Sequence, residues 1–209
     1  MSERFEKIPS SEQERILQAA LEEFAKNGYR RASTNAIVKA AGIPKGTLFY
    51  YFGSKINLFL YLVDGAVADY VSFVRAEKSE PPIELFERLL HREQVKLHFA
   101  SSHPLIFRFF SKVFLDIPEE ISEELGSRFR EYSAASADDL TVGLDLTRFQ
   151  EGVNVQDAIK MIHMLLEGIF TCYSPRLREA APDEFDALIH EISVECRRYF
   201  NMIQKGIYR

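Results

Sequence analysis

The stretch STNAIVKAAGIPKGTLFYYFGSK, residues 33–55, predicts two short helices joined by a tight turn, which is the most informative pattern in the chain. Ser33 is a typical N-cap for the first helix, and Gly42 suits the turn because glycine adopts the positive φ that other residues resist. Pro44 opens the second helix, where its missing N–H costs nothing, and this helix runs to Phe52. The layout is typical of a helix-turn-helix, whose second helix enters the major groove of DNA with its N-terminus first.

The first turn of that second helix carries residue types suited to DNA contact. Lys45 and Thr47 project from the exposed N-terminal turn, and Gly46 lets the backbone approach DNA closely. The N-terminus of the helix also bears a partial positive charge that favours phosphate. We therefore expect these three residues to face DNA.

The aromatic run that follows is expected to divide between two faces of the same helix. Leu48 and Phe52 are four residues apart and share the inner face. Tyr50 and Tyr51 offer hydroxyls and flat apolar faces to the DNA backbone and to thymine methyl groups. The alternative is that residues 49–52 form a core aromatic cluster. A helix this short cannot bury four consecutive large aromatic side chains, so we reject that alternative for the two tyrosines.

Charge is distributed unevenly along the chain. From Phe24 to Val63 there are six basic residues and no Asp or Glu, whereas the whole chain carries a net charge of −5. The segment therefore carries +6, which leaves −11 for the remainder. A basic module on an acidic body suits attraction to phosphate, because the field near a surface depends on charge within about 10 Å. The alternative is a chance fluctuation in an amphipathic region. The six basic residues are Lys26, Arg30, Arg31, Lys39, Lys45 and Lys55.

Almost every other segment has the helical period, and almost none alternates as a strand does. A helix over about 11–27, capped by Ser10 or Ser11 and stopped by Asn27-Gly28, precedes the helix-turn-helix, and a long helix over about 55–77 follows it. Residues 143–152 are expected to form a loop. The chain is thus predicted to be all-α, with about nine helices. The remaining helices are predicted over about 83–101, 104–115, 118–140, 155–173 and 183–204.

The stretch from about residue 16 to residue 60 resembles the N-terminal DNA-binding domain of TetR-family regulators. The resemblance implies a helix-turn-helix DNA-binding domain over 1–54, linked by the long fourth helix to a helical ligand-binding and dimerisation domain over 55–209. It also implies a homodimer, paired through the last two helices, that binds operator DNA and is usually a repressor released by a small molecule. The alternative for those two helices is an interior position in a monomer. The resemblance rests on Gly28-Tyr29, Ser33, Ile37, Ala41-Gly42-Ile43, Lys45-Gly46-Thr47-Leu48, Tyr51-Phe52 and Ser54-Lys55.

By position, the resemblance also assigns roles to individual residues. Ser33 and Lys55 would each hold a phosphate, at the start of the second and of the fourth helix. Tyr51 would lie at the DNA backbone. The residues that would face bases or backbone are Lys45, Gly46, Thr47 and Tyr50.

Three positions depart from the family pattern. Phe49 replaces a usual tyrosine and removes a hydroxyl that could contact phosphate, Ala36 replaces a frequent acid, and Val38 replaces a usual alanine. The change at Phe49 puts one phosphate contact in doubt.

The C-terminal part offers a candidate site for an apolar or aromatic small molecule. The predicted helix over 155–173 is apolar around much of its circumference, which indicates burial on several sides, against a pocket and against a partner subunit. The same residues could instead all belong to the core, and a regulator without small-molecule input would have a solid C-terminal core. Candidate walls are Phe107, Phe110, Phe114, Met161, Met164, Leu165 and Phe170, and candidate polar anchors are Arg108, His163, Glu167 and Tyr173.

Several other classes of protein are disfavoured. No stretch approaches the roughly 20 uninterrupted apolar residues of a membrane span, and the N-terminus lacks the apolar core of a signal peptide, so we expect a cytoplasmic protein with no membrane contact. Cys172 and Cys196 lie in apolar helical contexts and are expected to be buried thiols in a reducing compartment. The pairs His163/Glu167 and His91/His98 share helix faces, but no metalloenzyme or phosphate-loop motif accompanies them. We therefore expect no enzyme activity, no metal and no cofactor.

Overall fold

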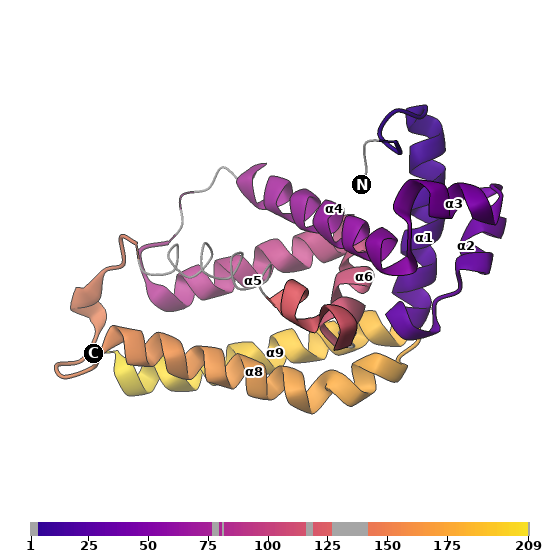
Figure 1. Cartoon of the computed structure of the whole chain (residues 1–209). Coiled ribbons are helices and arrows are strands. Elements are labelled where there is room, and N and C mark those ends of the chain that lie inside the picture. The colour runs from indigo at the N-terminus through magenta and orange to yellow at the C-terminus, as the bar shows by residue number, and fades with distance from the viewer. Residues whose placement is uncertain (1–3, 77–79, 81, 116–118, 127–141, 209) are drawn as a thin grey trace. The chain divides into compact units, whose positions relative to one another are not determined.

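The computed structural model describes residues 4–76, 80, 82–115, 119–126 and 142–208. Within these residues all regular structure is helical apart from one isolated β-bridge between Phe149 and Tyr208, which confirms the all-α class. The helix predicted over 118–140 falls mostly outside the described residues. The α-helices are α1 Ser10–Arg31, α2 Thr34–Ala41, α3 Lys45–Phe52, α4 Lys55–Ala76, α5 Leu85–Ser102, α6 Pro104–Leu115, α8 Val155–Glu179 and α9 Pro182–Ile207, and the 3-10 helices are η1 Glu119–Ile121 and η2 Leu146–Arg148 (Figure 1).

The turns around α2 form as the sequence predicts. Gly28 has φ 66° and interrupts α1, at the predicted stop. Ser33 caps α2, since its Oγ accepts a hydrogen bond from the Ala36 N–H at 3.3 Å. Gly42 ends α2 in the left-handed conformation, with φ 63° and ψ 35°, and its N–H donates back to the carbonyl of Lys39. The glycine turn of the helix-turn-helix is thereby confirmed.

The chain divides into two compact units that we describe separately. Unit 1 comprises residues 1–78 and 97–129, and unit 2 comprises residues 79–96 and 130–209, so that α5 contributes to both. This division groups residues by their contacts within the chain. The predicted boundary between residues 54 and 55 separates the DNA-binding module from the rest by function, so the division does not test it and it remains a prediction.

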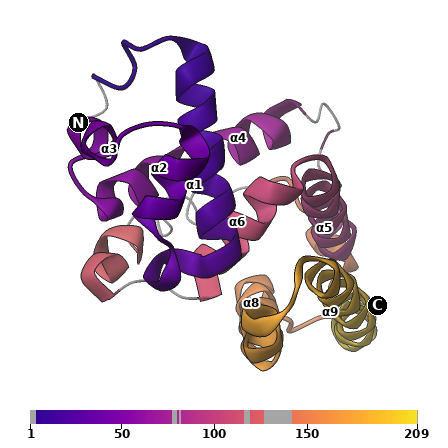
Figure 2. The ribbon, with the colours of Figure 1, turned by 90° about the vertical axis from the view of Figure 1, so that its right-hand side faces the viewer.

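The core of unit 1 is aromatic and joins α1 to α4 and α6. Phe24 of α1 meets Phe59 of α4 edge to face, with ring centroids 5.1 Å apart. Phe59 in turn meets Phe109 of α6 at 5.6 Å. All three side chains are at most 2% exposed, and Figure 2 shows α6 lying beside α1. The helix-turn-helix is therefore anchored to α4 and α6.

Helix α4 is a core helix of unit 1. Of the described helices, it alone is long and apolar enough to cross a membrane by length and composition. The core helix of a soluble protein passes the same test, and α4 buries one side against the rest of unit 1. The buried residues of α4 are Leu58, Phe59, Leu60, Leu62, Val63 and Ala66.

In unit 2, α8 and α9 lie side by side and antiparallel, and the first part of α5 shares their core (Figure 1). Tyr208 closes one end: its hydroxyl accepts the Leu85 N–H at 3.1 Å, and its ring meets Phe86 and Phe149 at 5.2 and 4.9 Å. Cys196 is buried in this core. These contacts join the C-terminal end of α9 to the start of α5.

The expectation that both thiols are buried is wrong for Cys172, which is exposed. Cys172 lies four residues after Gly168 and eleven after Met161, so all three share one side of α8. Each of these residues is exposed, because α9 and α5 cover only the opposite side within unit 2.

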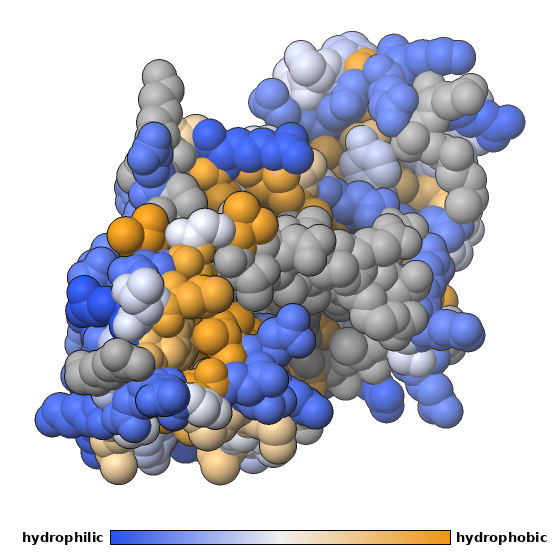
Figure 3. Space-filling view, turned by 90° about the vertical axis from the view of Figure 1, so that its left-hand side faces the viewer, coloured by the Kyte–Doolittle hydropathy of each residue, from blue (hydrophilic) through white to orange (hydrophobic). Residues whose placement is uncertain are grey.

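Apolar side chains also remain exposed near the start of α5. Ile83, Val142 and Leu146 are 63%, 69% and 60% exposed. The two segments that carry them are joined by a hydrogen bond of 2.8 Å from the Asp145 N–H to the Ile83 carbonyl. Figure 3 shows an apolar area on the face of the molecule where these segments lie. The described residues thus leave this end of unit 2 partly uncovered.

Substitution of Gly42 by alanine is expected to destabilise the protein by about 1–2 kcal/mol, because an L-residue resists the left-handed conformation. The added Cβ would meet no atom within 4 Å, so the cost comes from the backbone alone. Urea unfolding of Gly42→Ala measures it. Gly206→Ala is the control, since Gly206 is helical and its Cβ would also meet no atom within 4 Å, so this change should be neutral or stabilise by up to about 1 kcal/mol. Equal effects of the two substitutions would contradict the expectation.

Candidate nucleic-acid interface

Helix α3 has one buried and one exposed face. Leu48 and Phe52 are 2% and 3% exposed, which confirms the predicted inner face. On the other side Lys45 and Gly46 are exposed, and Tyr50 is 60% exposed. A Cβ added at Gly46 would meet no atom within 4 Å. The N-terminal turn of α3 is therefore open to close approach by another molecule.

Tyr51 and Thr47 are less exposed than their neighbours. Both are half-buried, and the Tyr51 ring meets the Phe5 ring edge to face at 5.6 Å. Phe5 covers part of the Tyr51 ring, a contact that helical spacing within residues 45–52 does not predict. Tyr51 contributes to the packing of α3 and still exposes part of its side chain.

The segment before α1 packs beside α3, which the sequence analysis did not foresee. Phe5 is fully buried and meets Phe52 and Tyr61 at 4.8 and 5.6 Å. The guanidinium of Arg4 lies 4.9 Å from the centre of the exposed Tyr50 ring. The available signal was an isolated Phe5 in an otherwise charged segment. Packing of this residue places an additional positive charge, that of Arg4, beside the exposed face of α3.

The start of α2 is held by a carboxylate that the sequence analysis also missed. Glu23 Oε1 accepts the Ser33 N–H at 2.8 Å and the Asn27 side-chain amide at 2.9 Å. Ser33 is exposed, and its hydroxyl oxygen accepts the Ala36 N–H. A hydroxyl that accepts in this way still has one hydrogen to donate, so Ser33 retains the donor that a phosphate contact needs.

The two lysines predicted to meet DNA differ in their surroundings. Lys45 is exposed, and its Nζ lies 5.9 Å from the centre of the Phe49 ring. Lys55 is half-buried: its Nζ donates to the Arg30 carbonyl at 3.3 Å and lies 4.7 Å from the centre of the Tyr29 ring. In the structure, therefore, Lys55 fastens the start of α4 to the end of α1.

The exposed charge of the module is positive. Between residues 24 and 63 there is no carboxylate side chain. Five of the six basic residues in this stretch are exposed, and only Lys55 is half-buried. A phosphate backbone near α3 would thus meet mainly cations and the N-terminal dipole of the helix. The exposed basic residues are Lys26, Arg30, Arg31, Lys39 and Lys45.

The residues proposed from sequence as a ligand site belong to two units. The members on α6 lie in unit 1, where Phe107, Arg108 and Phe110 are half-buried and the side chain of Phe114 lies outside the described residues. The members on α8 lie in unit 2, where five are exposed and two are half-buried. The exposed ones are Met161, His163, Met164, Glu167 and Phe170, and the half-buried ones are Leu165 and Tyr173. Their role in ligand binding remains a prediction.

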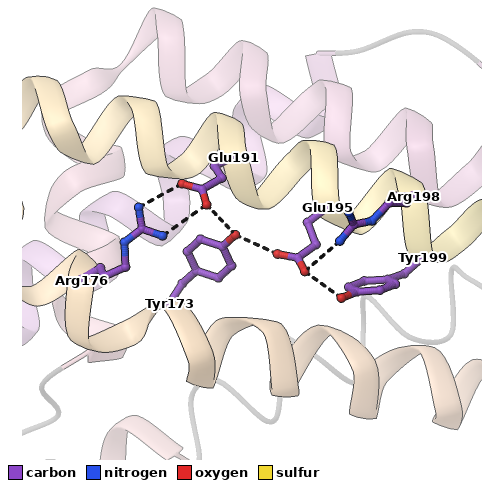
Figure 4. A network of polar contacts seen from close by, with 6 residues as sticks. All are labelled: Tyr173, Arg176, Glu191, Glu195, Arg198 and Tyr199. Carbon is purple, nitrogen blue, oxygen red and sulfur yellow. Dashed lines mark hydrogen bonds and ion pairs between the residues drawn. The ribbon is translucent and has the colours of Figure 1, made fainter.

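Tyr173 takes part in a polar network between α8 and α9 (Figure 4). Its hydroxyl lies 2.7 Å from Glu195 Oε2 and 3.0 Å from Glu191 Oε1. A phenol has one hydrogen to donate, and the shorter distance indicates Glu195 as the acceptor. Glu191 instead accepts hydrogen bonds from both terminal nitrogens of Arg176, with nitrogen–oxygen distances of 3.2 and 3.1 Å. The hydroxyl predicted as a ligand anchor is thus engaged with α9 in this structure.

The network shifts the ionisation of its members. Hydrogen bonds from Arg176 lower the pKa of Glu191, and those from Tyr173 and then Tyr199 lower the pKa of Glu195. The hydrogen bond to Glu195, together with partial desolvation, raises the pKa of Tyr173. Both carboxylates therefore favour their ionised form in the folded chain.

Comparison with known proteins agrees with this architecture. The family model described as "Bacterial regulatory proteins, tetR family" matches residues 16–62, which cover α2, α3 and parts of α1 and α4. The "Fatty acid metabolism regulator protein" of Bacillus subtilis (strain 168) is 23% identical over 164 residues, 76% of this chain and 81% of that protein.

Solved structures share the fold over nearly the whole chain. A TetR family transcriptional regulator from Chloroflexus aurantiacus J-10-FL has a TM-score of 0.64 at 20% identity, covering 99% of this chain and 98% of that chain. The transcriptional regulator FadR from Bacillus subtilis, in complex with stearoyl-CoA, has a TM-score of 0.58 at 19% identity, covering 87% of this chain and 96% of that chain. These likenesses show a common fold.

Replacement of Tyr173 by phenylalanine is expected to lower the melting temperature at pH 7 and to reduce its fall as the pH is lowered through 4.5 to about 2.5. The lowered carboxylate pKa values stabilise the fold above the ordinary glutamate pKa of 4.5, and this stabilisation is lost as the pH falls through the folded-state values. Tyr50→Phe is the control, because it removes a hydroxyl from an exposed ring and should change neither value. If Tyr173→Phe had the same pH dependence as the wild type, the network would not contribute to stability.

Proposed function

The chain belongs to the TetR family of bacterial regulatory proteins, and from this premise we propose that it is a ligand-responsive repressor that binds palindromic operator DNA as a homodimer. TetR-family proteins are transcription regulators and not enzymes. The observation that carries the proposal is the exposed N-terminal turn of α3, set in a segment from residue 24 to residue 63 with six basic residues and no carboxylate. Operator binding would place the protein in the cytoplasm, without membrane contact.

Helix α3 is proposed to read the major groove from its N-terminal end. Lys45 would reach a base or phosphate, and the missing side chain of Gly46 would let the backbone approach the DNA. Tyr50 would add its hydroxyl and flat ring, with Arg4 beside it to attract phosphate. Thr47 and Tyr51 would contact the DNA through the exposed parts of their side chains. Ser33, at the start of α2, and Lys55, at the start of α4, would each hold a phosphate.

Pairing of α8 and α9 with the same helices of a second copy would set the spacing of the two recognition helices. Dimeric helix-turn-helix proteins place these helices one turn of DNA apart. Large exposed apolar side chains on a single subunit commonly mark a contact surface, and both helices carry them. They are Met161 and Met164 on α8, 43% and 64% exposed, and Val194 and Met202 on α9, 55% and 64% exposed.

A small apolar effector is proposed to release the repressor from DNA. The candidate contacts proposed from sequence remain Phe107 and Phe110 of α6, in unit 1, and Phe170 of α8, in unit 2, each considered within its own unit. Because α4 links the DNA-binding module to the remainder of the chain, an effector that shifts α4 would change the separation of the recognition helices. Effector and operator must then weaken each other reciprocally, by about 1–3 kcal/mol.

Fatty acyl thioesters are the first effector class to test. The support is the likeness to a fatty acid metabolism regulator and to a regulator solved with stearoyl-CoA. An acyl chain also suits the apolar walls named above.

Binding to genomic fragments around the coding region of the protein, measured over a series of salt concentrations, tests DNA recognition. The wild type is expected to bind one fragment tightly and with strong salt dependence, and Lys45→Ala is expected to lose this binding because it removes a cation from the N-terminal turn of α3. Addition of stearoyl-CoA to the wild-type complex tests release. Equal weak binding by wild type and Lys45→Ala would overturn the proposed function, whereas failure of release alone would overturn only the effector class.

Loss of the Lys55 side chain is expected to weaken operator binding almost irrespective of sequence and to flatten the salt slope by about one unit, because one phosphate contact disappears. Binding isotherms of Lys55→Ala at several salt concentrations measure this change. The melting temperature of the free variant, recorded in parallel, reports the separate contact of Lys55 with Arg30 and Tyr29. An unchanged affinity and slope, with a lowered melting temperature, would assign Lys55 to folding and not to DNA.

A further inference from the structure

Unit 1 contains a groove of about 260 Å³ between α1, α4 and α6. Five aliphatic side chains, which we call its floor, line the groove together with Gly65, Tyr61 and the exposed Gln18 of α1. Tyr61 forms one wall with its ring. The floor residues are Leu17 and Leu21 of α1, Leu62 and Ala66 of α4, and Ile106 of α6.

The rim of this groove is acidic. Glu14 of α1 and Asp69 of α4 both line it and are both exposed, and no basic residue lines it. A third carboxylate, Glu6, is close enough that its charge, after the larger effect of burial, raises the pKa of Tyr61. The negative potential therefore comes from α1, from α4 and from the segment before α1.

We propose that this groove binds a small amphiphilic organic cation, such as an alkylammonium ion. The apolar tail would lie on the leucines of the floor, and the cationic head would lie between Glu14 and Asp69. The groove shares no lining residue with the proposed effector site, and binding there does not require DNA.

Size and charge together select this class of ligand. Pockets for drug-sized ligands usually occupy about 300–1,000 Å³, so this groove suits a molecule of roughly ten non-hydrogen atoms and is too small for a helix of a partner protein. A fatty acid would bring its carboxylate next to Glu14 and Asp69 and be repelled. A neutral alcohol would gain the floor contacts without the attraction of the rim.

Gly65 provides a way to close the groove without disturbing the fold. It lies on α4 in the lining, and a Cβ added there would meet no atom within 4 Å. A leucine at this position would fill space that a ligand tail would otherwise occupy. Because leucine is also a better helix former than glycine, the variant should fold at least as well as the wild type.

Isothermal titration calorimetry on the full-length protein without DNA tests the proposal with three ligands that share one eight-carbon tail, namely n-octylammonium, n-octanol and octanoate. Octylammonium is expected to bind at least about tenfold more tightly than octanoate, from the combined attraction of two exposed carboxylates. Octanoate binding as tightly as octylammonium would overturn the proposal.

Variants locate the site. Gly65→Leu should weaken octylammonium binding more than about tenfold while its melting temperature is retained, because the tail loses its floor. The double variant Glu14→Gln/Asp69→Asn should lose most of the preference for octylammonium over octanol, with Glu6 as the remaining carboxylate. Asp64→Asn, which removes one carboxylate from α4 outside the groove lining, is the control and should bind octylammonium nearly as the wild type does. Unchanged octylammonium binding by a folded Gly65→Leu would overturn the proposed location, whatever the outcome of the DNA-binding experiments.

Discussion

The aromatic packing of Phe24, Phe59 and Phe109 is the interaction on which the DNA-contacting surface depends. Helices α2 and α3 have eight residues each, which is too short for either to be stable alone in water. They hold their geometry because α3 packs Leu48 and Phe52 into the core that the three phenylalanines join to α4 and α6. The same core makes α4 a mechanical link from the helix-turn-helix to the rest of unit 1.

Features fixed by neighbouring residues could be predicted from sequence. The Gly42 turn, the Ser33 cap and the inner face of α3 follow from local backbone preferences and helical spacing, and the structure confirms all three. Contacts between distant segments could not be predicted in the same way. Phe5 covers Tyr51, and Lys55 reaches the end of α1, 25 residues earlier. No local pattern encodes either contact, so neither could be predicted from the sequence of α3 or of the start of α4.

The C-terminal helices show the same limit on prediction. Helical spacing on α8 marks Tyr173 as a possible ligand anchor. Only the structure of the antiparallel pair α8 and α9 shows that two carboxylates of α9 lie within hydrogen-bond distance of its hydroxyl. Similarly, apolar periodicity suggested a buried Cys172, whereas one chain covers only one side of α8. An uncovered side that carries Met161 and Met164 is consistent with a second subunit. The prediction of burial thus assumed a partner that the sequence of a single chain does not display.

In the proposed complex, two recognition helices held apart by the dimer enter successive major grooves of one operator. Guanine N7 methylation interference on the bound fragment reports this arrangement, because N7 lies in the major groove. We expect two clusters of interfering guanines, related by dyad symmetry and centred about one helical turn, roughly 10 base pairs, or a multiple of it apart. A single cluster, or interference spread evenly along the fragment, would contradict it.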